Sequence, residues 1–198
     1  MLNKSFIVCL GVISWALFSS FDIGIKTIND FSLRNVDGKY ISLKDNEQAK
    51  GYIVIFTCNH CPFAKLYPSR INKLQETYAP LGVPVIAINS MDSMLYEEEC
   101  FKFMQQKSKD NNFNFPYLQD ASQEVAKDFG AVNTPQAFVI WRDENRWVIK
   151  YKGAIDDNGE SPELAKNFIA MAVNDLLANK PLSIPTTESF GCKIFYRK

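Results

Sequence analysis

The feature that most constrains the fold is a run of four apolar residues that leads into a pair of closely spaced cysteines. Residues 53–56 read IVIF, and the CNHC motif of residues 58–61 begins two positions later. A short, continuous apolar run of this kind is typical of a central strand that is covered on both faces. The sequence therefore predicts a buried strand with a CxxC motif at its carboxyl end.

A helix is expected to begin at this motif, because apolar residues recur at near-helical spacing from Phe63 to Tyr78, with a kink at Pro68. The start of a helix offers unpaired backbone N–H groups and a positive dipole end, which favour a thiolate over a thiol. The thiolate is the nucleophile in disulfide exchange. We therefore interpret Cys58 as the attacking, more exposed sulfur and Cys61 as the resolving one.

The two residues between the cysteines are expected to tune the pair. A histidine beside the nucleophile can share charge and hydrogen bonds with the thiolate, which stabilises the reduced form and makes the disulfide more oxidising. His60 is the one histidine of the chain, and Asn59 precedes it. Both are interpreted as tuning residues, with no metal ligand among them.

The rest of the chain alternates strand and helix patterns. In chain order we expect a hairpin about Asp37-Gly38, a strand at 83–89, a largely helical stretch at 91–112, a short helix opened by residues 120–123 and closed by Gly130, strands at 136–141 and 146–153, a helix at 162–178 and a tail at 179–198. This order predicts an α/β fold with a central mixed β-sheet, flanking helices and an N-terminal β-hairpin.

The first twenty residues differ from the remainder. Lys4 precedes an uncharged apolar stretch at 6–18, and two serines follow it. This pattern predicts a secretory signal peptide or an N-terminal membrane anchor, with one domain at 22–198. The protein is therefore expected to be periplasmic or otherwise exported, with residues 1–20 as the means of any membrane association.

The composition limits the classes of partner and ligand that we expect the protein to bind. Lys plus Arg and Asp plus Glu both number 22, so no basic surplus predicts nucleic-acid binding. A CxxC pair is also half of a zinc site, and Cys100 and Cys192 would complete four sulfurs, but no second CxxC or histidine pair exists. A thiol-based carrier of cuprous ions is another alternative. No cofactor is expected.

A second element, Thr134-Pro135, precedes the strand at 136–141. The segments FTCNHCP and, some seventy residues later, FGAVNTPQAFVI resemble the thioredoxin superfamily. The resemblance implies a thioredoxin-like fold and a cis bond between Thr134 and Pro135, facing the CxxC motif as a strand-like dock for substrate. Further segments, among them FPYLQDASQEVAKDFGA and YKGAIDD, resemble the peroxiredoxin-like branch of the redoxin family, which is related to AhpC/TSA proteins.

The sequence departs from that family in two respects. Peroxiredoxins carry T-x-x-C and an activating arginine, but Thr57 directly precedes Cys58, and the loop that would hold the arginine reads Thr134-Pro135. Thioredoxins carry a buried aspartate six residues before the first cysteine, where this chain has Tyr52. The peroxide-activating set is therefore expected to be absent, with His60 or water in place of the aspartate.

Two further cysteines remain. Cys100 is interpreted as a buried packing thiol, and Cys192 as either a packed end of the tail or a third redox thiol folding back toward the site. The sequence as a whole predicts an exported thiol–disulfide oxidoreductase whose partners are protein or small-molecule disulfides and dithiols and a partner redox protein. A thiol peroxidase and a non-enzymatic copper or thiol carrier are the alternatives.

Overall fold

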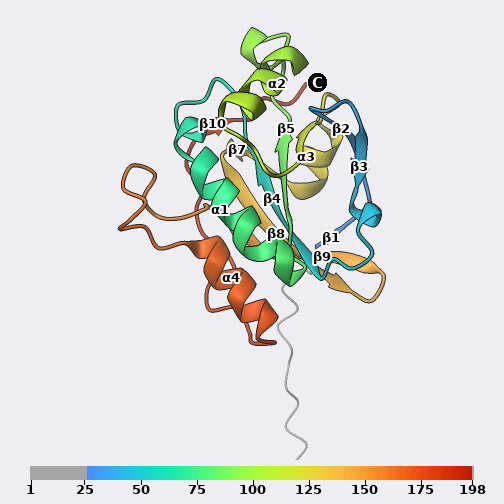
Figure 1. Cartoon of the computed structure of the whole chain (residues 1–198), viewed down its shortest axis with the longest axis vertical. Helices are drawn as coiled ribbons and strands as arrows, with labels where there is room; N and C mark the ends of the chain where they lie inside the picture. Colours follow the sequence, from blue (N-terminus) through green and yellow to red (C-terminus); the bar gives the residue numbers. More distant parts are fainter. Residues whose placement is uncertain (1–25, 198) are drawn as a thin grey trace, which may run out of the picture.

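A mixed sheet forms the centre of the molecule. The structure is a computed structural model that describes residues 26–197, and its eight-stranded sheet has the order β1-β9-β8-β4-β5-β6-β2-β3 (Figure 1). These strands are β1 (Thr27–Ile28), β2 (Ser32–Asn35), β3 (Tyr40–Ser42), β4 (Gly51–Phe56), β5 (Val85–Asn89), β6 (Tyr117–Gln119), β8 (Gln136–Asp143) and β9 (Arg146–Gly153). Strand β4 pairs in parallel with β5 and antiparallel with β8, so it lies in the interior of the sheet.

Helices cover both faces of this sheet. Helices α1 (Pro68–Tyr78) and α4 (Phe168–Leu177) lie side by side over one face, whereas α3 (Glu124–Phe129) packs on the other (Figure 1). Helix α2 (Phe101–Asp110) lies at the end of the sheet where β5 finishes. Side chains of β4 alternate between the two cores, because successive residues of a strand point to opposite faces. Val54 and Phe56 join the core that also contains both cysteines of the CxxC motif.

The expected α/β architecture is confirmed. The N-terminal hairpin is the antiparallel pair β2–β3, and the predicted strand at 146–153 coincides with β9. The short helix before Gly130 is α3, which ends at Gly130 in the left-handed conformation. Parallel β4–β5 and antiparallel β8–β9 supply the two kinds of pairing that the sequence pattern indicates.

Three helix starts differ from expectation. The stretch expected to be largely helical from residue 91 forms α2 only from Phe101, after a 3-10 turn at 97–99. No helix begins at Cys58: α1 starts at Pro68, after a short 3-10 turn, η2 (Ala64–Leu66), and Pro68 is its first residue rather than a kink within it. The last helix starts at Phe168, where the Asn167 side chain accepts from the backbone N–H of Ala170. The predicted start at residue 162 is therefore wrong, because Asn167 is the residue that caps the helix.

The predicted signal peptide or anchor at 1–20 lies outside the described residues. Within residues 26–197, no helix combines the length and the apolar character needed to cross a membrane.

Candidate active site

The CxxC motif lies beside the loop that contains Thr134. The Cys58 Sγ is 2.9 Å from the Thr134 Oγ1 and hydrogen-bonded to it, and the Cys61 Sγ is 3.2 Å from the Thr134 carbonyl oxygen. The Thr134–Pro135 peptide bond is cis, as the family resemblance implies. Both cysteines are free thiols. The structure thus brings together the two elements that the sequence analysis selected, residues 58–61 and residues 134–135.

Both sulfurs are inaccessible. Cys58 and Cys61 each have a relative exposure of 0%. The expectation that Cys58 is the more exposed sulfur is therefore wrong, because no helix start lifts it to the surface and other segments cover it. Access to this pair requires either a movement of the chain or a third group that can reach solvent.

A buried carboxylate occupies the position where a helix dipole was expected to act. Glu99, the last residue of the 3-10 turn η4 (Glu97–Glu99), is 1% exposed. Its oxygens accept hydrogen bonds from the backbone N–H of Asn59 at 2.9 Å and of His60 at 2.8 Å, and from the Asn89 side chain at 2.7 Å. The N–H groups after Cys58, which would otherwise stabilise its thiolate, are thus directed at Glu99.

The side chains of Asn59 and His60 complete this network. His60 Nδ1 is 2.5 Å from a Glu99 oxygen, and its ring stacks on Tyr96 with the centroids 4.1 Å apart. Asn59 Oδ1 accepts a hydrogen bond of 2.9 Å from the hydroxyl of the fully buried Tyr117. Both residues predicted to tune the pair are therefore held in place, and His60 contacts Glu99 directly.

The electrostatic environment shifts the pKa values of the two cysteines in opposite directions. A hydrogen bond with Cys61, burial and the negative charge of Glu99 all raise the pKa of Cys58. By contrast, hydrogen bonds from Cys58 and from Cys192 lower the pKa of Cys61 to about 4. The surroundings thus disfavour a thiolate at Cys58 and favour one at Cys61.

The third cysteine of the site comes from the C-terminal tail. Strand β10 (Cys192–Lys193) pairs antiparallel with β7 (Asn133–Thr134), with Cys192 opposite Thr134. Cys192 packs against the core cluster that holds the CxxC motif, which places it among the site residues. Cys100 lies elsewhere, at the N-cap of α2, and it is partly exposed rather than buried as expected.

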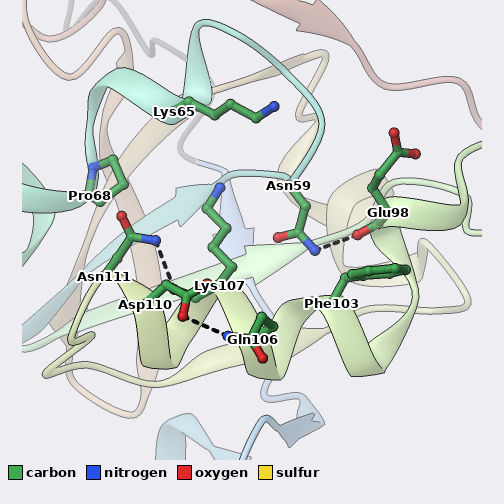
Figure 2. Close-up of a pocket in the computed structure, with 9 residues that line it drawn as sticks. All are labelled: Asn59, Lys65, Pro68, Glu98, Phe103, Gln106, Lys107, Asp110 and Asn111. Carbon is green, nitrogen blue, oxygen red and sulfur yellow. Dashed lines mark hydrogen bonds between the residues drawn. The ribbon is translucent and has the colours of Figure 1, made fainter.

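A pocket of about 320 Å³ adjoins the motif on the side of α2 (Figure 2). Asn59 forms part of its wall, and the amino groups of Lys65 and Lys107 lie beside it. Lys107 also donates to the Cys58 carbonyl oxygen at 2.5 Å, and burial lowers the pKa of this lysine. The pocket therefore places positive charge next to the buried Cys58–Glu99 pair.

Three potential metal ligands also meet here. Donor atoms of Cys58, His60 and Glu99 lie within 4.8 Å of one another, and these residue types can bind zinc. Both Glu99 oxygens, however, already accept hydrogen bonds from the protein. The carboxylate thus positions the loop of residues 59–60.

Sequence reasoning did not select Glu99, Lys107 or Tyr117. Glu99 stands in the run Glu97–Glu99, and such a run normally indicates a solvated surface. Tyr117 belongs to β6, a strand of three residues that is too short to show a periodic pattern. One feature of the sequence pointed to such a residue. Position 52 carries no acidic side chain, so a carboxylate near the cysteines has to come from another segment.

Comparisons with known proteins identify the family of the chain. The AhpC/TSA family matches residues 25–157. The crystal structure of an uncharacterized conserved protein from Geobacillus kaustophilus is 33% identical, covers 87% of this chain and 92% of its own, and superposes with a TM-score of 0.79.

Two further relatives have informative names. A thiol-disulfide oxidoreductase ResA of Bacillus thuringiensis subsp. konkukian is 24% identical over 69% of this chain and 78% of its own length. The exposed lipoprotein thioredoxin Etrx1 of Streptococcus pneumoniae, at 17% identity, shares the fold with a TM-score of 0.57 over 76% of this chain and 99% of its own. The chain belongs to the AhpC/TSA family, in the redoxin branch of the thioredoxin superfamily.

Proposed function

We propose that the protein is an exported thiol–disulfide oxidoreductase in which Cys58 and Cys61 alternate between dithiol and disulfide. The observation that carries this proposal is the contact of both sulfurs with Thr134, at 2.9 Å and 3.2 Å, next to the cis-proline. The oxidoreductase class agrees with the family and with the name of the ResA relative. No cofactor takes part, because two thiols store the two electrons that are exchanged.

The chemistry assigns a separate task to each group. Cys58 attacks a substrate disulfide, and the neighbouring Glu99–His60 pair takes up its proton, because a base beside a weak nucleophile activates it at the moment of attack. Cys61 then attacks the Cys58 sulfur of the mixed disulfide. The substrate leaves as a dithiol, and the chain retains a Cys58–Cys61 disulfide that a partner redox protein reduces.

The surroundings of the cis-proline suit a protein or small-molecule disulfide. A pocket of about 160 Å³ beside Pro135 is lined in part by Phe63, Leu66 and Phe190, which are 52%, 42% and 69% exposed. Exposed apolar groups next to a redox site are suited to contact a partner's apolar side chains. Export, and membrane association through residues 1–20, belong to this proposal on the strength of the sequence pattern at the N-terminus.

Single serine substitutions test the proposal. Cys58→Ser is expected to abolish the reduction of insulin disulfides with dithiothreitol as electron donor. Cys61→Ser is expected to accumulate a mixed disulfide at Cys58, detected by mass spectrometry without reductant, because the resolving sulfur is gone. Cys100→Ser, which lies outside the site, is the matched control and should retain wild-type turnover.

The possible outcomes distinguish an error in the roles of the two cysteines from an error in the proposed dithiol chemistry. Trapping by Cys58→Ser together with turnover by Cys61→Ser would reverse the two assignments. Wild-type turnover in both variants would overturn the proposed dithiol chemistry.

A further inference from the structure

The C-terminal tail is joined to the substrate-docking edge as an additional strand. Cys192 pairs with Thr134, and the Ile194 N–H donates to the Val132 carbonyl at 2.9 Å. Gly191 makes the approach possible, because a Cβ at this position would lie 2.0 Å from the Thr134 carbonyl oxygen. The tail thus lies directly on the segment that the family resemblance identifies as the dock.

Several contacts beyond Cys192 fasten this strand. Ile194 is 2% exposed, and the Tyr196 hydroxyl donates to the Ala131 carbonyl at 2.5 Å. Arg197 Nε donates to Asp92 at 2.7 Å, while its backbone N–H donates to the Gln123 side chain at 2.8 Å. The segment is therefore docked by apolar burial and by ionic contact, so it is not a loosely associated end.

The docked tail brings a third cysteine to the site, and the three cysteines differ in their exposure to solvent. Cys58 and Cys61 are 0% exposed, whereas Cys192 is partly exposed. Cys192 lies opposite Thr134, whose carbonyl oxygen is 3.2 Å from the Cys61 sulfur, so the two cysteines flank the same residue. Burial and the nearby Cys61 raise the pKa of Cys192 to about 12. Of the three cysteines, Cys192 is the one with a partly exposed surface.

We propose that Cys192 is a third redox-active thiol, which exchanges with Cys61 and thereby connects the buried pair with thiols and disulfides in solution. This inference rests on the proposed function of the CxxC motif and adds the route by which electrons reach it. The observation that supports this inference is that the β7–β10 pairing places Cys192 opposite Thr134, the residue that Cys61 contacts.

The step is an intramolecular disulfide exchange. In the oxidised protein, Cys192 gives up its proton and its sulfur attacks the Cys61 sulfur. The Cys61–Cys192 bond forms as the Cys58–Cys61 bond breaks, and the leaving Cys58 sulfur takes up a proton. One disulfide is present before and after, so no external oxidant or reductant is consumed. An external thiol then attacks the Cys192 sulfur, which breaks the Cys61–Cys192 bond, releases Cys61 as a thiol and leaves a mixed disulfide on Cys192. A second external thiol attacks the external sulfur of this mixed disulfide, which releases Cys192 as a thiol and the two external thiols as one disulfide.

Disulfide mapping in the Cys58→Ser protein tests the new bond. The full-length variant is equilibrated with glutathione disulfide, quenched with acid, alkylated and digested with trypsin under non-reducing conditions. We expect a cross-linked product of residues 51–65 and 167–193 in most molecules, which reports a Cys61–Cys192 disulfide. The same product should be lost in Cys58→Ser/Cys192→Ser and retained in Cys58→Ser/Cys100→Ser.

A kinetic measurement on the otherwise intact protein tests the relay. Cys192→Ser should slow the reaction of the oxidised pair with glutathione by about tenfold or more, because exchange rates depend on access to the attacked sulfur. Cys192→Ala should behave in the same way, and thermal unfolding should show that both variants retain the fold.

Background levels of the cross-linked product, or wild-type rates in both Cys192 variants, would overturn the inference. Either result leaves the proposed function standing, because that function requires Cys58 and Cys61 alone. Insulin reduction by the wild type is measured in parallel, and its absence would overturn the proposed function itself.

Discussion

At the scale of single residues, Glu99 is the buried acidic group beside the cysteine pair. The free-energy cost of burying its carboxylate is offset by hydrogen bonds from two backbone N–H groups and two side chains. The negative charge beside Cys58 opposes formation of the Cys58 thiolate. In the proposed function Glu99 is the base for the Cys58 proton, and so takes the role of the aspartate that is absent at position 52, although it comes from a different part of the chain.

Glu99→Gln is expected to lower the pKa of Cys58. Removing a nearby negative charge favours the thiolate, so the alkylation of Cys58 should move to lower pH, by about one unit for a charge at this range. The measurement is the rate of iodoacetamide modification against pH in a Cys61→Ser background, in which Cys58 is the member of the pair that reacts. Glu97→Gln, at an exposed position of the same turn, is the control and should leave the profile unchanged.

An unchanged or upward-shifted profile in Glu99→Gln would mean that Glu99 acts on the loop geometry and leaves the Cys58 charge unaffected.

Direct reaction with hydrogen peroxide should be slow. Thr57 stands next to Cys58 rather than three residues before a cysteine, and among residues 26–197 no arginine donates a hydrogen bond to either sulfur. Without such donors the leaving oxygen of the peroxide is not stabilised, so the pair should react at the rate of an ordinary thiol. Stopped-flow oxidation of the reduced protein measures this, and a rate far above that of free cysteine would contradict the expectation.

At the scale of elements, long patterns were predictable and short ones were not. The continuous apolar run of β4 identifies this strand, because a strand covered on both faces carries apolar residues at successive positions. Strands β7 and β10 contain two residues each, and no period can be read from two residues. The start of α1 was misplaced because apolar spacing continues through residues 63–67, while Pro68 sets the actual first turn.

The same limit applies to the site. The CxxC motif and Thr134-Pro135 carry local signatures, so both could be located from the sequence. Glu99 and Cys192 reach the site only through the pairing of distant segments, β7 with β10 above all. Nothing in the composition of the tail indicates where it docks.

Gly191→Ala should loosen the tail from the dock. The added methyl group would lie 2.0 Å from the Thr134 carbonyl oxygen, and the backbone φ of +150° also disfavours a side chain. We expect faster alkylation of Cys192 in the native protein, measured by peptide mapping after short exposure to iodoacetamide. Glu188→Ala, at an exposed position of the same tail, should leave that rate unchanged. Equal rates in the two variants would show that the tail tolerates the substitution in place.

At the scale of the whole molecule, the core on the α3 side of the sheet packs against both the sheet and the CxxC motif. Phe129 of α3 packs edge-on against Phe56 and Phe138, with ring centroids 5.3 Å and 5.1 Å apart. Phe56 lies two residues before Cys58, so this aromatic cluster fixes the strand that carries the motif. The α/β class could be predicted because it depends on element order, whereas this packing depends on side chains from three separate segments.

Phe129→Ala should reduce the free energy of unfolding by about 3–5 kcal/mol, because the ring is 1% exposed and its removal leaves a cavity. Urea denaturation followed by circular dichroism measures the change. Tyr40→Ala, at a side chain that is 67% exposed, is the control and should remain within about 0.5 kcal/mol of the wild type. A loss below about 1 kcal/mol would show that the cluster does not anchor the core.

The docked tail has a consequence for which substrates the protein accepts. A polypeptide that pairs with Thr134 competes with a strand that belongs to the same molecule. Under the proposed roles of the CxxC motif and Cys192, an extended substrate must displace this strand, whereas a small thiol that reaches Cys192 displaces nothing. We therefore expect residues 191–197 to favour small thiols over weakly binding extended peptides.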